Sequence, residues 1–158
     1  MAGKLAGSND LERLADLCGR TYKEQAVWFL NAFWDQFQGE AEKLWKHVLL
    51  CADLDSQRHA DGTALDELNA HRFLEQIGET LTVVALRERL RKTGAIGQAE
   101  RPKAVPLTHY ILWRYEVDWH VLVNTSGTLR PSSPLSLFIF VIIQKKNNKQ
   151  IIKYYHQK

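Results

Sequence analysis

Four carboxylates stand close together in one polar stretch of the sequence, between two segments with helical patterning. Asp53 and Asp55 open this stretch, Asp61 lies near its end, and Asp66 comes at the start of the next helical segment. Carboxylate oxygens are preferred calcium ligands, because the ion is a hard cation that takes about six to eight oxygens. These four residues are therefore the candidate metal ligands of the chain.

The chain repeats one plan, helix–loop–helix, at residues 40–77 and again at 82–119. Two such units together are typical of paired EF-hands, in which apolar residues at loop position 8 join the loops through a short two-stranded bridge. Leu65 and Val105 are the natural candidates, because each is apolar and lies just before a helical segment. The plan predicts that Leu65 and Val105 face each other.

This register places unsuitable residue types at the calcium positions of the first loop. Positions 1, 3 and 5 fall on Arg58, Ala60 and Gly62, the turn-making glycine is replaced by Thr63, and the bidentate glutamate is replaced by Asn69. An irregular loop that bound calcium would have to take its oxygens from the four aspartates instead.

The second loop departs from the calcium pattern in the same way. Positions 1, 3 and 5 fall on Gln98, Glu100 and Pro102, with Lys103 in place of the glycine and His109 in place of the glutamate. We therefore expect degenerate calcium loops, no bound cofactor and no regular metal site.

No constellation predicts catalysis. The histidines do not pair at helical spacing, so a solvated or capping role is expected for each of them: His47, His59, His71, His109, His120 and His156. The chain has no Gly-x-Ser-x-Gly elbow and no glycine-rich phosphate loop. Cys18 and Cys51 are expected to be reduced, buried thiols. We expect no enzyme, no catalytic residue and no nucleic-acid partner; the basic run at 87–92 is interpreted as the solvated face of a helix, with an interface as the alternative.

The elements that would position these residues are helical. Asn9 and Glu12 form a capping box that opens a short helix. Further helices are expected over 22–37, 40–54, 65–77, from Thr80 or Thr82 to Lys92, and from Pro106 to Trp119. Periodicity points several side chains inward: Leu11, Leu14, Ala15, Cys18, Ala26, Leu30, Phe33, Trp34, Phe37, Leu44, Trp45, Val48, Leu68, Phe73, Leu74, Val83, Leu86 and Leu90.

The last of these helices is unusually aromatic. Tyr110, Trp113 and Tyr115 cannot all lie on one narrow stripe of a helix. Burial on nearly all sides would explain this, and one aromatic edge serving as a docking surface is the alternative.

Charge and composition divide the chain near residue 125. Residues 1–118 hold 15 basic and 18 acidic residues, whereas 119–158 hold six basic residues and no acid. A Pro/Ser-rich stretch at 126–134 precedes nine mostly apolar residues, 135–143, which are far fewer than the roughly 20 of a membrane-spanning helix. This run could be a strand or a membrane-touching segment; an appended tail is the simpler interpretation. We expect an N-terminal extension at 1–21, a helical domain at 22–124, and a linker and basic tail at 125–158 outside the core.

Four stretches carry a resemblance to a known family. They are Glu24–Trp34 (EQAVWFLNAFW), Ala41–Trp45 (AEKLW), Leu65–Glu75 (LDELNAHRFLE) and Val105–Tyr115 (VPLTHYILWRY). Together they resemble the N-terminal part of the calcium-regulated actin-bundling proteins of protists, over residues 22–120.

The resemblance implies an all-α fold: a paired EF-hand-like helix–loop–helix bundle with extra N-terminal helices and an irregular tail. It also implies a cytoplasmic, cytoskeleton-associated protein that binds actin filaments. The alternative is a pseudo-EF-hand adaptor that binds a partner helix and is unrelated to actin. No secretion signal and no transmembrane span are expected, and the sequence leaves the partner-binding residues and the oligomeric state undetermined.

Overall fold

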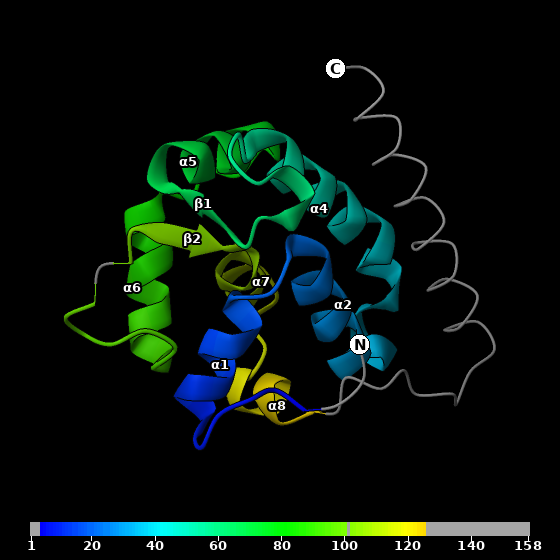
Figure 1. The fold of residues 1–158 in the computed structure, drawn as a ribbon, viewed down its shortest axis with the longest axis vertical. Helices are drawn as coiled ribbons and strands as arrows, with labels where there is room; N and C mark the ends of the chain where they lie inside the picture. The colour runs from blue at the N-terminus through cyan, green and yellow to red at the C-terminus, as the bar shows by residue number, and fades with distance from the viewer. Residues whose placement is uncertain (1–3, 101, 126–158) are drawn as a thin grey trace.

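The computed structural model describes residues 4–100 and 102–125, which form a mostly helical structure with one small sheet (Figure 1). The predicted helical class is therefore confirmed. The tail predicted from residue 125 onward falls almost entirely outside the described residues. The helices are α1 (Asp10–Cys18), α2 (Tyr22–Ala32), α3 (Trp34–Phe37), α4 (Ala41–Leu54), α5 (Glu67–Gln76), α6 (Val83–Thr93), α7 (Leu107–Tyr115) and α8 (Trp119–Asn124). The strands are β1 (Ala64–Asp66) and β2 (Ala104–Pro106), and single 3-10 turns span Gln38–Glu40 and His59–Asp61.

Two short strands join the two helix–loop–helix units. β1 pairs with β2 in antiparallel register, and Leu65 lies opposite Val105. The contact predicted between these two residues is therefore present. Figure 1 shows the two strands side by side, with α5 beside β1 and α6 beside β2. We call residues 55–63, between α4 and β1, the first loop, and residues 94–103, between α6 and β2, the second loop.

Local capping sets where several helices begin and end. The side chain of Asn9 accepts a hydrogen bond from the Glu12 N–H at 2.9 Å, and that of Thr82 accepts one from the Ala85 N–H at 3.1 Å. Such caps satisfy N–H groups that have no partner within the helix. Gly94 ends α6 in the left-handed conformation, with φ of 81°, which glycine adopts without steric cost. Of the two predicted starts for this helix, Thr82 is the one observed.

The N-terminal helix belongs to the same core as the rest of the described chain. Leu14 and Leu17 are buried, and α1 packs on α8. The predicted inward positions of Leu11 and Ala15 were wrong, because Leu11 is 55% exposed, Ala15 is exposed too, and the buried stripe runs through Leu17 instead. The same error applies to Leu68 of α5, which is 59% exposed. Sequence periodicity places both leucines on the apolar face of their helix. It does not show which edge of that face is covered by a neighbouring element.

The helix predicted over 22–37 is broken at Phe33, whose φ of −126° and ψ of 33° are not helical. The break lets the ring of Phe37 pack on both Phe29 and Tyr115, with ring centroids 5.4 and 4.9 Å apart. Phe29 also stacks on Tyr115 at 5.0 Å. Aromatic contacts of this kind contribute about 0.5–1.5 kcal/mol each beyond burial, which is enough to offset one interrupted turn of helix.

The last predicted helix is also two helices. α7 ends at Glu116, which has a left-handed φ of 51°, and α8 begins at Trp119. Two tryptophan side chains fix this arrangement: Trp28 Nε1 donates to the Leu122 carbonyl and Trp119 Nε1 donates to the Thr93 carbonyl, both at 2.8 Å. Most of α7 is buried, and Trp113 is only partly buried. This agrees with burial of the helix on nearly all sides.

Candidate functional site

The four candidate aspartates surround the first loop, but they do not converge. Asp53 is exposed in the last turn of α4, and Asp61 is exposed in the 3-10 turn of the loop. Asp55 is partly buried directly after α4, and Asp66 lies at the N-terminus of α5. Each of the last two has a structural role that uses its oxygens.

Both oxygens of Asp55 are occupied by groups of the protein itself. Oδ1 accepts hydrogen bonds from the backbone N–H groups of Gln57 and Arg58, at 3.2 and 2.9 Å. Oδ2 accepts the hydroxyl of Tyr22 at 2.7 Å. Two effects raise the pKa of the Tyr22 phenol far above its usual range: mainly its burial, and also this hydrogen bond to a carboxylate. Asp55 therefore holds the first loop against α2.

Gly62 lets the first loop come this close. A Cβ at this position would lie 1.9 Å from Asp55 Oδ2 and 2.8 Å from a ring carbon of Tyr22. The Gly62 carbonyl also accepts the Tyr22 N–H at 3.2 Å. The loop therefore needs glycine for a close approach of its backbone to a side-chain pair, and its φ of −70° is one that any residue adopts.

Asp66 is the N-cap of α5. Its Oδ1 accepts the Asn69 N–H at 2.8 Å, and its Oδ2 accepts the Asn69 side-chain amide at 3.1 Å. Asn69 stands where a calcium loop has its bidentate glutamate, and here its side chain is turned toward Asp66. Two candidate ligand positions thus bind each other.

The second loop offers one carboxylate near its middle, that of Glu100, and this group also bonds within the loop. Glu100 Oε2 accepts the Gly97 N–H at 3.3 Å. Gln98 donates from Nε2 to the Arg91 carbonyl at 3.2 Å. His109, at the position of the glutamate ligand, is buried inside α7, where burial lowers its pKa to about 4 and favours the neutral imidazole.

Within residues 4–100 and 102–125, histidine, cysteine, aspartate and glutamate side chains nowhere gather in a group of three or more that could hold a metal ion. The carboxylates that calcium would need are either exposed and apart or already bonded to N–H and O–H groups.

Two arginines of α6 fill a role that the sequence did not predict. Arg87 Nη2 donates to the carbonyl of Pro102, and Arg91 Nη2 donates to the carbonyl of Glu100 at 2.8 Å. The predicted solvated face of this helix was therefore wrong for these two residues, although Arg89 and Lys92 are exposed. Only the loop geometry reveals this, because the four basic residues look alike in the sequence.

A buried glutamine connects both units to the N-terminal helices. The side chain of Gln25 is fully buried; its Nε2 donates to the carbonyls of Arg20 and Thr63, at 2.7 and 2.8 Å. Its Oε1 accepts both the N–H and the hydroxyl of Thr108, at 2.8 and 2.7 Å. Helical periodicity gave no reason to place a polar residue at the centre of the core, so sequence reasoning missed this site.

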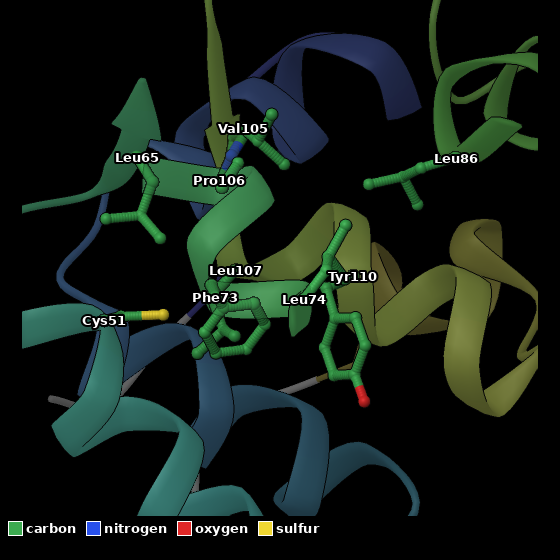
Figure 2. A pocket seen from close by; sticks show the side chains of 10 residues that line it. Cys51, Leu65, Phe73, Leu74, Leu86, Val105, Pro106, Leu107 and Tyr110 are labelled. Atoms are coloured by element: carbon green, nitrogen blue, oxygen red, sulfur yellow. The ribbon is translucent and has the colours of Figure 1, made fainter. Parts of the chain in front are cut away.

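The two helix–loop–helix units enclose a small apolar recess, shown in Figure 2. Its lining comes from four helices and both strands: Cys51, Leu65, Ala70, Phe73, Leu74, Leu86, Val105, Pro106, Leu107 and Tyr110. The sulfur of Cys51 points from α4 toward the other lining side chains (Figure 2). The cavity volume is about 10 Å³, which is room for roughly one water molecule or methyl group. The recess is far smaller than a small-molecule site.

Two histidines and Cys51 are buried, whereas Cys18, also predicted to be buried, is only partly buried. His47 and His109 are 5% and 7% exposed, so the predicted solvated or capping role was wrong for them. The ring of His47 packs edge-on against Phe73 and Tyr110. Burial raises the pKa of the Cys18 thiol to about 12 and raises that of Cys51 as well, so both thiols are protonated at neutral pH.

Comparison with protein-family models, with curated proteins and with solved structures finds no match. In the described part of the chain, no helix has the length and apolar character needed to cross a lipid bilayer.

Proposed function

We propose that this chain is a non-catalytic, EF-hand-like module of an actin-filament-associated, bundling-type protein, and that its loops keep their shape without calcium. The observation that carries the fold part is the antiparallel pairing of Leu65 with Val105. It joins two helix–loop–helix units, α4–α5 and α6–α7, at the position where paired EF-hands are bridged.

The calcium-independent part is supported by the loops themselves. Asp55 and Asp66 use their oxygens for Tyr22 and Asn69, respectively. Satisfied carboxylates of this kind would have to give up existing hydrogen bonds before they could bind a cation, and each such bond to a charged group contributes about 1.5–3 kcal/mol. Regulation by calcium is therefore not part of the proposal.

The actin part is supported by the resemblance across residues 22–120 to the protist actin-bundling proteins. A cytoplasmic, cytoskeletal location follows from the same proposal. The non-catalytic part is supported by the thiols, since Cys51 is buried, Cys18 is partly buried, and both are protonated at neutral pH.

Co-sedimentation of the full chain with actin filaments tests the proposal. We expect saturable co-sedimentation with filaments that is the same in EGTA and in calcium. We also expect the filaments to be bundled, so that they sediment at low centrifugal speed. The matched control replaces four tail lysines in the full chain: Lys145→Gln, Lys146→Gln, Lys149→Gln and Lys153→Gln. Filaments attract polybasic segments non-specifically, so this variant should still pellet if the helical part binds.

Two results would count against the proposal. Pelleting that disappears in the lysine variant would assign binding to tail charge, and absence of pelleting by the unaltered chain would remove actin. The adaptor that binds a partner helix would then remain as the second candidate.

A further inference from the structure

The second loop is contacted by two positive charges that belong to the protein. Arg87 and Arg91 are one turn apart on α6, so both side chains emerge on the same face of the helix. Arg87 donates to the Pro102 carbonyl, and Arg91 donates to the Glu100 carbonyl at 2.8 Å. Two backbone oxygens of the loop therefore receive charged donors.

Arg87 also reaches the other helix–loop–helix unit. Its Nη1 lies 3.2 Å from Glu67 Oε2 at the start of α5, and its side chain is only 11% exposed. One guanidinium thus binds a loop carbonyl and a carboxylate at the same time. A calcium ion in such a loop takes the same two kinds of oxygen, and a guanidinium fork can satisfy both because it presents several donors in fixed directions.

Further hydrogen bonds within and beside the second loop support this closure. The Glu100 carboxylate accepts the Gly97 N–H, and the Glu100 N–H donates to the Gly97 carbonyl at 3.1 Å. Where α6 ends, the Thr93 carbonyl accepts Trp119 Nε1. The loop is therefore tied at its start, middle and end by groups of the chain itself.

We infer that Arg87, assisted by Arg91, is a built-in replacement for the loop cation. The second loop is permanently closed by a side-chain charge, and its shape does not respond to divalent cations. This inference rests on the paired-loop architecture and not on actin binding, so a failed pelleting experiment leaves it standing.

Hydrogen exchange of the full chain, followed by mass spectrometry, tests this inference. We expect Arg87→Met to accelerate exchange in peptides that cover residues 94–106 by at least about tenfold, because opening the loop exposes its amides. Arg91→Met should act on the same peptides more weakly, since it removes one bond. The matched control is Arg89→Met on the same helix, whose side chain is 44% exposed and pairs with Glu116 at the surface; it should leave these peptides unchanged.

Arg87→Lys is a milder second variant that keeps the positive charge, and it provides a test even if Arg87→Met fails to fold. Lysine lacks the fork and can hold the carbonyl or the carboxylate but not both, so its exchange rates should lie between those of the unaltered chain and Arg87→Met. If Arg87→Met unfolds, Arg87→Lys and Arg91→Met still decide, and unchanged exchange at 94–106 in both overturns the inference.

A second experiment tests whether the second loop responds to calcium. It compares hydrogen exchange of the unaltered chain in EGTA with that of the same chain in 5 mM calcium. We expect identical exchange at 94–106. A tenfold slowing in calcium would show that the loop takes a divalent ion, and it would overturn the assignment of this role to Arg87.

Discussion

Gln25 and Thr108, which lie 83 residues apart, share two hydrogen bonds in the centre of the molecule: Gln25 Oε1 accepts the Thr108 N–H at 2.8 Å and its hydroxyl at 2.7 Å. Pro106, the N-cap of α7, provides no side-chain acceptor. Gln25 therefore caps α7 from a different helix, and through Nε2 it holds the Thr63 carbonyl of the first loop as well.

Replacing Gln25 with leucine should destabilise the protein by about 2–4 kcal/mol. Leucine has a similar volume but removes the acceptor of the Thr108 N–H and the donor to the Thr63 carbonyl, and each polar group that loses its partner in the core costs about 1–3 kcal/mol. Urea unfolding monitored by circular dichroism measures the change. Gln36→Leu, at an exposed position of α3, is the matched control and should change stability by less than about 0.5 kcal/mol. Equal effects of the two variants would contradict the proposed role of Gln25.

Gly62→Ala should also be strongly destabilising, by about 2–4 kcal/mol, because the new methyl group would overlap Asp55 Oδ2 and the Tyr22 ring. The comparison is Gly39→Ala, where a Cβ would meet no atom within 4 Å. That change should be neutral or stabilise by up to about 1 kcal/mol, because alanine restricts the unfolded chain. Thermal unfolding of the two variants side by side measures the difference, and a Gly62→Ala protein as stable as the original would show that the first loop is not closed over Asp55.

Acidification should unfold the protein through its buried histidines. Burial lowers the pKa of both His47 and His109 from 6.5 to about 4. Between these two pH values the histidines are therefore mostly protonated in the unfolded chain and mostly neutral in the folded one. Stability is therefore complete above about pH 6.5 and falls as the pH drops toward 4, by roughly 2 kcal/mol per histidine between pH 7 and 5. Urea unfolding at a series of pH values measures this slope.

Variants assign the slope to particular residues. His47→Phe keeps an aromatic ring against Phe73 and Tyr110 and should reduce the slope over this range by about half. His71→Phe, at an exposed position of α5, should leave it unchanged. Stability that stays constant from pH 7 to 5 in the original chain would contradict the prediction.

Ending the chain after Thr125 should change the melting temperature by less than about 3 °C. The described core reaches from Leu5 to Val123, and Thr125 closes α8 by donating its hydroxyl to the Leu122 carbonyl at 3.0 Å. Differential scanning calorimetry of the full and shortened chains measures the difference. A loss of 10 °C or more, which corresponds to about 2–3 kcal/mol for a domain of this size, would show that the apolar run at 135–143 completes the core.

The sequence predicted what depends on neighbouring residues. The cap at Asn9 follows from the pairing of Asn9 with Glu12, Thr82 was one of two predicted caps, and Val83, Leu86 and Leu90 are buried as helical spacing requires. The Leu65–Val105 contact was also predictable, because the repeated helix–loop–helix plan fixes the register of both loops at once.

The features that the sequence did not reveal are set by contacts between distant segments. The break at Phe33 depends on Tyr115, and the capping of α7 depends on Gln25. The break at Glu116 accompanies the docking of Trp119 onto Thr93. Likewise, Arg87 and Arg89 are equivalent by composition, and only the position of the second loop gives them different partners.

The reactivity of the Cys51 thiol would report local opening of this molecule. Cys51 lines the recess between the two units and is 2% exposed as a residue, so a thiol reagent can reach its sulfur only when the helices around the recess part. The rate at which Cys51 is labelled, divided by the rate for an unfolded cysteine peptide, would yield the free energy of that opening. A ligand that wedged the units apart would speed the reaction, and one that clamped them would slow it.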